Sequence, residues 1–260
     1  MTFEDHTVTI NAANFHYRRG GAGPSLLYLH GAGGTANAMP LLESFAQHFD
    51  VVIPDHPGFG ASDDPQWLDN IHDMAYFYLD FLQTLQLTET VIFGSSLGGW
   101  LAMEIAIRDQ SRIRQLILSN AAGLSLPDVA MGDVFLWDDE QKVRNMIVSP
   151  ALQDKILAQT PSEQQQDIAS RNLFTTAKLC WEPRFCNPDL HKWLHRITVP
   201  ALIVWGDNDR LFPQDYGQQL KHCIPQARLV VFNDCGHLPH VEKRDELCDE
   251  ILSFTREVSA

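Results

Sequence analysis

Six short, almost uninterrupted apolar runs constrain the fold of this chain more than any other feature. Strands with one face in water alternate apolar and polar residues, so these runs predict strands buried on both faces. Amphipathic stretches of helical length lie between them, and such alternation predicts a doubly wound, mostly parallel α/β sheet. The predicted strands are 25–30, 51–53, 91–93, 116–118, 201–205 and 229–232, and the predicted helices are 39–48, 71–85, 97–107 and 213–224.

Two regions depart from this alternation. Short β-type runs at 8–10 and 15–17 predict an opening hairpin. Between 121 and 198 no buried-strand pattern occurs, and prolines separate four helical stretches. We therefore predict an α/β core from residues 1–121 and 198–260, with a helical cap insertion, 122–197, folded over the sheet. The four predicted cap helices are 138–147, 150–159, 162–179 and 188–194.

Composition excludes several classes of protein. Hydrophobic residues make up 45% of the 260 residues, enough for a large core, so disorder is not expected. The net charge of −14 disfavours nucleic-acid partners and anionic membranes. No apolar run reaches the roughly 18 residues of a membrane helix, and no signal peptide is visible, so we expect a cytoplasmic protein. Five cysteines without a CxxC motif predict free thiols.

Residues 94–98 read GSSLG and carry the sharpest chemical signal. The pattern G-x-S-x-G selects Ser96 and not Ser95, and it lies between a predicted strand and a predicted helix. A sharp strand-to-helix turn leaves one side chain in a strained conformation above the sheet, and flanking glycines avoid collisions. Ser96 is therefore the candidate nucleophile, although a plain glycine-rich turn is the alternative.

A serine nucleophile needs a general base, and the base needs an orienting carboxylate. Asp207 and Asp209 follow the predicted strand 201–205, and His237 follows the strand 229–232. All three lie at strand carboxyl ends, where parallel sheets place their sites. Small residues at 30–34, HGAGG, would let backbone N–H groups approach a developing oxyanion, or they form another turn. The spacing does not decide whether Asp207 or Asp209 is the orienting carboxylate.

Taken together, these motifs resemble the α/β-hydrolase superfamily with a helical cap. The resemblance covers almost the whole chain and runs in the family's order through 30–34, 55–62, 94–99, 206–210 and 236–237. It implies an eight-stranded, mostly parallel sheet in the α/β-hydrolase fold. In the family, the stretch corresponding to 55–62 (DHPGFGAS) shapes the pocket floor, but a purely structural turn is the alternative.

The resemblance also implies roles for individual residues. Ser96 would be the nucleophile, His237 the base, and the backbone N–H groups of Ala32 and Leu97 the oxyanion donors. The family places its acid just before an apolar residue and a proline, and the sequence DRLFP at 209–213 matches that frame. Asp209 is therefore favoured over Asp207.

The residue at the strand-to-helix turn, Ser96, narrows the range of possible reactions. Haloalkane dehalogenases and epoxide hydrolases of this superfamily use an aspartate there, so Ser96 excludes both. Carbon–carbon hydrolases of aromatic ring cleavage typically have Gly-Pro in the oxyanion loop, Asn before the serine and Trp after the histidine. This chain has Gly33-Gly34, Ser95 and Leu238 instead. We predict a carboxylic ester hydrolase, with carbon–carbon, lactone, amide or peracid chemistry as alternatives.

A receptor for small molecules is the alternative from a different class, because some proteins with this fold are not catalytic. For the enzyme we predict a small-molecule substrate, a monomer or homodimer, and no cofactor, since serine acyl transfer supplies its own nucleophile. No metal is predicted, because His191 and His195 lack the glutamate of an H-E-x-x-H motif.

The cap carries the candidate substrate-binding residues. Phe135, Trp137 and Trp181 would form an apolar wall over the nucleophile, or they pack the cap on the sheet. Arg184 would clamp a substrate carboxylate, as carbon–carbon hydrolysis requires, or it pairs with a surface carboxylate such as Glu182 or Asp189.

Overall fold

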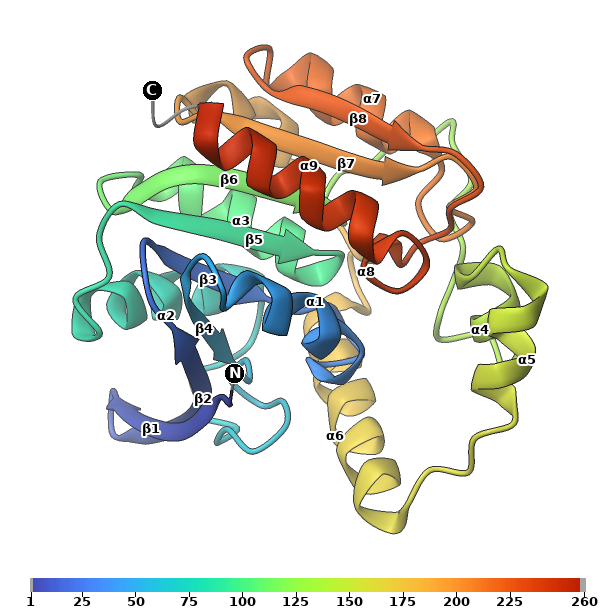
Figure 1. The fold of residues 1–260 in the computed structure, drawn as a ribbon, viewed down its shortest axis with the longest axis horizontal. Helices are drawn as coiled ribbons and strands as arrows, with labels where there is room; N and C mark the ends of the chain where they lie inside the picture. The colour runs from blue at the N-terminus through green and yellow to red at the C-terminus, as the bar shows by residue number, and fades with distance from the viewer. Residues whose placement is uncertain (1, 258–260) are drawn as a thin grey trace.

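The computed structural model describes residues 2–257, and an eight-stranded sheet runs through its centre (Figure 1). The strand order is β1-β2-β4-β3-β5-β6-β7-β8. β2 pairs antiparallel with β1 and β4, and all other pairs are parallel, which confirms the predicted mostly parallel sheet. The strands are β1 (Glu4–Ile10), β2 (Ala13–Gly21), β3 (Ser25–Leu29), β4 (Asp50–Pro54), β5 (Thr90–Ser95), β6 (Ile113–Ser119), β7 (Ala201–Gly206) and β8 (Arg228–Phe232).

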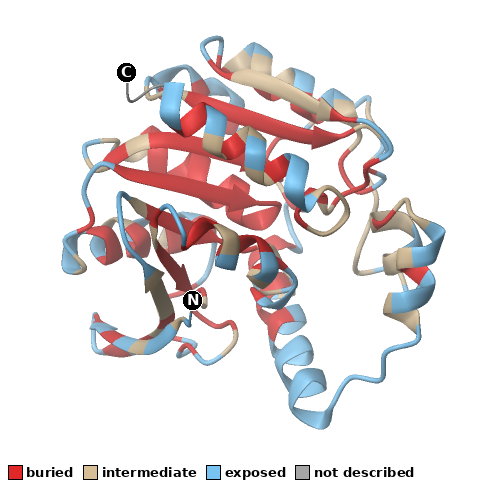
Figure 2. Cartoon of the chain, in the orientation of Figure 1, coloured by how far each residue is buried: buried red, intermediate tan, exposed pale blue. Residues whose placement is uncertain are grey.

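Helices cover both faces of the sheet, which explains why its strands read as continuous apolar runs (Figures 1 and 2). On β3, Leu26 and Tyr28 pack on one face, whereas Leu27 and Leu29 pack on the other. Each fully buried side chain of this size contributes roughly 1.5–3 kcal/mol through the hydrophobic effect. One face carries α1 (Met39–Phe45) and α9 (Arg244–Glu257), and the other carries α2 (Ile71–Thr84), α3 (Leu97–Arg108) and α7 (Gln214–Cys223).

The predicted opening hairpin is confirmed and is longer than the sequence pattern indicated. β1 and β2 pair in register from Glu4–Arg19 to Ile10–Ala13. The turn residues Asn11 and Ala12 both have positive φ, 48° and 61°, as a two-residue hairpin turn compatible with strand twist requires.

The insertion contains three α-helices, α4 (Asp139–Met146), α5 (Pro150–Leu157) and α6 (Glu163–Cys180), close to three of the predicted stretches. Asp138, Ser149 and Ser162 cap their first turns through side-chain oxygens. The predicted helix 188–194 is wrong. The chain there forms two short 3₁₀ turns, η2 (Leu190–Lys192) and η3 (Leu194–Arg196), joined at Trp193 (φ −112°, ψ −12°).

Only the second half of α6 lies against the core, because residues 163–171 are exposed (Figure 2). Leu179 and Cys180 at the end of the helix join the hydrophobic core, and the rest of the contact is polar. The Arg171 guanidinium donates to the carbonyls of Gly58 and Ser62, and the Thr175 hydroxyl donates to that of Gly58 at 2.7 Å. The Asn172 side chain accepts from the Gly60 amide at 3.0 Å. The 55–62 stretch is therefore a structural turn on which the cap helix docks.

Two short helices complete the described fold, η1 (Ala36–Ala38) directly before α1 and α8 (Pro239–Glu242) directly before α9. Within residues 2–257, no helix combines the length and apolar character needed to cross a membrane.

Candidate active site

Ser96 occupies the turn between β5 and α3 in a conformation that L-residues rarely adopt, with φ 54° and ψ −115°. Glycines at both flanks are required by close backbone packing. A Cβ on Gly94 would lie 2.3 Å from the Gly98 carbonyl oxygen, and one on Gly98 would lie 1.9 Å from the carbonyl oxygen of Leu29. The predicted strained turn is therefore confirmed, and it presents Ser96 at the N-terminus of α3.

The structure brings Ser96, His237 and Asp209 into one hydrogen-bonded chain. Ser96 Oγ lies 3.0 Å from His237 Nε2, and His237 Nδ1 donates to Asp209 Oδ2 at 2.8 Å. All three residues are buried, with 8%, 1% and 5% of their surface exposed. Asp207 does not join them, because its carboxylate accepts from the Cys235 amide and from Asn208.

The Asp209 carboxylate is held by further donors. Oδ1 accepts from the amides of Leu211 and Phe212 at 2.8 and 3.0 Å, and Oδ2 accepts from Asn120 Nδ2 at 2.6 Å. These bonds offset the cost of removing a carboxylate from water. Sequence reasoning missed Asn120, although its place directly after the buried strand β6 was a usable signal.

The two predicted oxyanion donors belong to different segments of the chain, α3 and the 31–34 turn. Leu97 is the first residue of α3, so its amide has no acceptor within the helix. Ala32 belongs to the 31–34 turn and lines the same cavity as Ser96. The turn approaches closely, since a Cβ on Gly31 would lie 3.2 Å from Ser96 Cβ. The small residues of the HGAGG segment make this approach possible.

A buried pair of histidines supports that turn. The His30 and His56 rings stack with centroids 3.7 Å apart. His30 Nδ1 donates to the Gly31 carbonyl at 2.7 Å, and its Nε2 accepts from the His56 amide at 3.1 Å. Burial lowers the pKa of both rings, and each ring also lies beside the other. Neutral histidines therefore fix the backbone next to Ser96, a role that the sequence did not reveal.

A cavity of about 110 Å³ opens beside Ser96 and His237. Five apolar side chains that the sequence analysis did not propose as substrate-binding line it: Val134, Met146, Phe185, Leu211 and Leu238. No lysine, arginine, aspartate or glutamate in the described chain lines it. His240 also borders the cavity, and burial together with nearby His237 lowers its pKa to about 4, so it is neutral at pH 7.

The predicted substrate-binding residues of the cap do not line this cavity. Phe135 stacks on the cavity-lining Phe185, with ring centroids 5.3 Å apart. Trp181 is half exposed, and the Arg184 guanidinium lies over its ring at 4.2 Å. Trp137 is only partly buried and packs at the edge of the core cluster.

Arg184 has a partner that the sequence analysis did not name. Its guanidinium pairs with Asp133 at 3.3 Å, rather than with Glu182 or Asp189. Because the guanidinium is held between a carboxylate and two aromatic rings, it faces neither Ser96 nor the cavity beside it.

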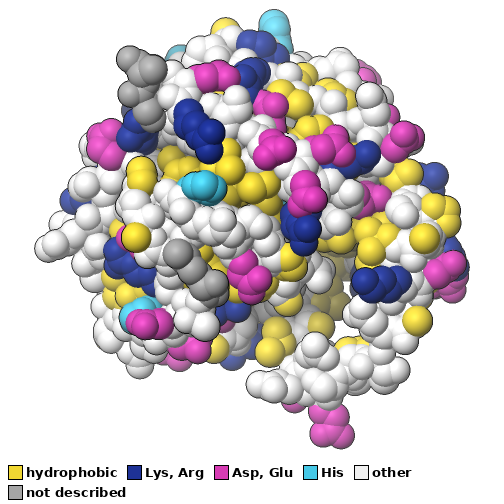
Figure 3. Space-filling model, in the orientation of Figure 1, with side chains coloured by type: hydrophobic (Ala, Val, Ile, Leu, Met, Phe, Trp, Pro, Cys, Tyr) yellow, Lys and Arg dark blue, Asp and Glu magenta, His cyan; other side chains and the backbone are white. Residues whose placement is uncertain are grey.

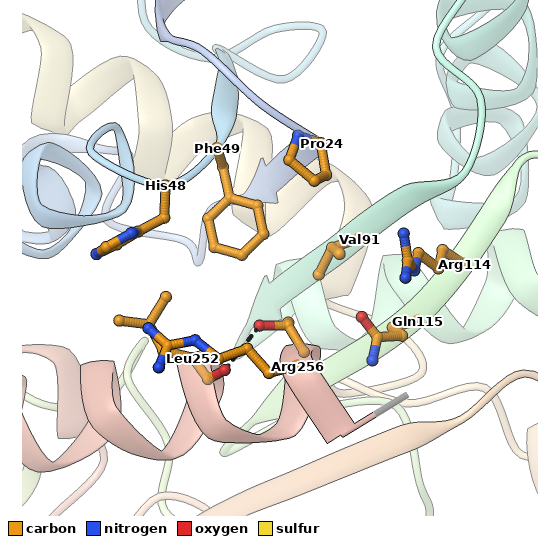
Figure 4. Close-up of a pocket in the computed structure, with 9 residues that line it drawn as sticks. Pro24, His48, Phe49, Val91, Arg114, Gln115, Leu252 and Arg256 are labelled. Atoms are coloured by element: carbon orange, nitrogen blue, oxygen red, sulfur yellow. Dashed lines mark hydrogen bonds between the residues drawn. The ribbon is translucent and has the colours of Figure 1, made fainter. Parts of the chain in front are cut away.

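The surface is hollowed in two further places. The surface is recessed between α6 and the α4–α5 pair, with hydrophobic side chains in the recess (Figure 3). A separate cleft lies between α9 and the amino ends of β3, β5 and β6, where Pro24, Val91 and Gln115 line it (Figure 4). Ser96 follows the carboxyl end of β5, so this cleft is at the opposite end of the sheet.

The arrangement has the parts needed for acyl transfer by a serine: a hydroxyl on a strained turn, a buried imidazole within hydrogen-bond reach, and a carboxylate on the far imidazole nitrogen. Among residues 2–257, no group of three or more metal-ligating side chains gathers. Fold and site together define an α/β protein with the layout of a serine hydrolase.

The chain belongs to the alpha/beta hydrolase family, whose sequence model matches residues 26–250. It is 28% identical to a 2-hydroxy-6-oxo-2,4-heptadienoate hydrolase of Pseudomonas putida, over 86% of each chain. It is 26% identical to Lipase 1 of Psychrobacter immobilis, over 90% of this chain and 77% of the lipase. A thermophilic esterase from Thermogutta terrifontis has the same fold, with a TM-score of 0.76 at 23% identity and complete coverage of both chains.

Proposed function

We propose that this protein is a serine hydrolase that cleaves carboxylic esters of small, mostly apolar and uncharged molecules. The observation behind the proposal is the hydrogen-bonded chain Ser96–His237–Asp209 beside a cavity to which the described residues contribute no Lys, Arg, Asp or Glu side chain. The small cavity volume favours short acyl groups.

In the proposed mechanism, His237 Nε2 takes the proton of Ser96 Oγ as the hydroxyl attacks the ester carbonyl. The amides of Ala32 and Leu97 would stabilise the oxyanion of the tetrahedral intermediate. His237 then gives the proton to the departing alcohol, which leaves an acyl-enzyme on Ser96. Asp209 holds the imidazole in the tautomer with hydrogen on Nδ1 and stabilises the imidazolium. Water activated by His237 releases the acid.

A panel of p-nitrophenyl esters from acetate to decanoate tests the proposal beside Ser96→Ala. We expect short chains to be preferred, and kcat of the variant to fall by roughly 10⁴ to 10⁶ with the fold retained. Ser95→Ala is the matched control and should keep most activity. Absence of hydrolysis on every ester, together with no labelling of Ser96 by a fluorophosphonate, would overturn the proposal.

Carbon–carbon bond hydrolysis is the second candidate, favoured by the 28% identity to the Pseudomonas putida enzyme named above. A dienoate substrate carries a carboxylate, and no Lys or Arg among the described residues lines the cavity to receive it. Arg184 is engaged with Asp133 instead. The assay monitors the loss of absorbance of 2-hydroxy-6-oxo-2,4-heptadienoate. Turnover of this substrate faster than that of any ester would establish the alternative.

A further inference from the structure

We infer that Glu242 is a positioning residue: it binds the cap corner between α4 and α5 to the loop that carries His237, and so holds that imidazole against Ser96. The inference rests on the proposed function of the Ser96–His237–Asp209 chain. Among the described residues, Glu242 itself does not line the cavity, and its hydrogen bonds go to the backbone of Val148, Ser149 and Gly236 rather than to the three residues.

The Glu242 carboxylate joins two segments that are far apart in the sequence. Oε2 accepts from the Gly236 amide at 2.7 Å, one residue before His237. Oε1 accepts from the amides of Val148 and Ser149, at 2.6 and 3.1 Å, at the corner that leads into α5. Each of these bonds is charge-assisted, and together they use both oxygens of the carboxylate.

The backbone completes the same junction. The His237 amide donates to the Met146 carbonyl at 2.9 Å, so the last residue of α4 touches the candidate base directly. The approach is so close that a Cβ on Gly236 would lie 2.4 Å from that carbonyl oxygen. The glycine of the Gly-His pair is therefore required by the cap, and not by the histidine loop alone.

This junction connects the cavity to the base. The Met146 residue lines the cavity, and its carbonyl holds the His237 amide. A shift of the α4–α5 corner would consequently move the His237 backbone, and a displacement near 1 Å is enough to cost about a hundredfold in rate. Glu242 limits that shift because it holds the corner and the loop at once.

The isosteric change Glu242→Gln tests this role, since an amide offers one acceptor oxygen and presents an NH₂ group to backbone donors. Glu246→Gln is the matched control, because it removes the same charge from an exposed side chain paired with Lys243 at 3.6 Å. Gly236→Ala is a second variant that opens the junction from the other side. Rates are normalised to the folded fraction measured by near-UV circular dichroism.

The readout is the dependence of kcat/KM on the leaving group. Ethyl acetate needs a proton from His237 for its alcohol, whereas p-nitrophenolate leaves without one. We expect Glu242→Gln and Gly236→Ala to lose at least tenfold more kcat/KM on ethyl acetate than on p-nitrophenyl acetate. Glu246→Gln should match wild type on both. Equal losses on the two esters would reduce Glu242 to a structural role and overturn the inference.

Amide hydrogen exchange separates this result from a failure of the proposed function. Peptides covering 144–150 and 233–240 should exchange at least tenfold faster in Glu242→Gln, whatever reaction the enzyme catalyses. Unchanged exchange in both peptides would show that Glu242 does not hold the junction. If exchange rises but the wild-type protein hydrolyses no ester, the proposed function fails, and the positioning role for ester hydrolysis fails with it.

Discussion

Asn120 offers the sharpest test of how the buried carboxylate is held. Its Nδ2 donates to Asp209 Oδ2 at 2.6 Å, the oxygen that also accepts from His237. The residue has no exposed surface and a φ of 45°. Asn120→Gly removes the hydrogen bond and tolerates this backbone conformation, whereas Asn120→Ala removes the bond and adds backbone strain.

The magnitudes follow from these contacts. Loss of a buried hydrogen bond to a charged group costs about 1.5–3 kcal/mol. Removal of the side chain also removes Asn120 Oδ1, which is buried without a hydrogen-bond partner. Loss of that buried oxygen raises the unfolding free energy by about 1 kcal/mol. Glycine adds about 0.5–1 kcal/mol through the entropy of the unfolded chain. Asn120→Gly should therefore lower the unfolding free energy by about 1–3 kcal/mol, and Asn120→Ala by about 1 kcal/mol more.

Urea denaturation followed by tryptophan fluorescence measures both differences, and the same proteins give kcat on p-nitrophenyl acetate. We expect kcat to fall about tenfold in each variant, equivalent to about 1.4 kcal/mol, because Asp209 loses one of the groups that orient it. Wild-type stability and kcat in Asn120→Gly would refute the reasoning. A glycine variant less stable than the alanine variant would refute the argument from backbone strain.

Three further outcomes are expected. Asp209→Asn should lower kcat by roughly 10⁴ through the wrong His237 tautomer, whereas Asp207→Asn should keep most activity; the reverse ranking would transfer the role to Asp207. His240, with its pKa lowered to about 4, stays neutral when folded but gains a proton on unfolding below pH 6.5, so the unfolding free energy falls by up to about 3 kcal/mol from pH 6.5 to 4. Denaturation across that range should show a flatter dependence for His240→Leu, and an unchanged slope would contradict this account. Arg184→Ala should change kcat/KM equally on a neutral ester and on a dicarboxylate half-ester, because the guanidinium is already paired with Asp133. A tenfold selective loss on the half-ester would instead indicate that Arg184 binds a substrate carboxylate.

Local sequence was sufficient for much of the site because the relevant constraints are local. Gly94 and Gly98 are required by the turn that strains Ser96, and the pattern G-x-S-x-G records that requirement directly. The carboxyl ends of β7 and β8 bring Asp209 and His237 to the same edge of the sheet. The spacing alone did not decide whether Asp207 or Asp209 orients His237. In the structure the Asp207 carboxylate accepts from the Cys235 amide, whereas the Asp209 carboxylate accepts from His237.

Contacts between distant segments could not be predicted in the same way. The polar support of Asp209 by Asn120 and the junction of Glu242 with the cap join residues about 90 positions apart. The aromatic residues of the cap misled for a related reason. Composition predicts an apolar wall, but which side chains face the cavity depends on how α4 and α6 dock. Phe185 and Met146 line the cavity, whereas Trp137 and Trp181 do not.

The sequence by itself determined the layered sheet and the position of the nucleophile, because burial on both faces and a strained turn leave periodic and local marks in the chain. The tertiary structure decided which carboxylate meets His237, what supports the 31–34 turn, and that Arg184 pairs with Asp133 outside the cavity. Those outcomes depend on hydrogen bonds and ion pairs that form only after the core has packed, and spacing along the chain does not by itself choose among the possible partners.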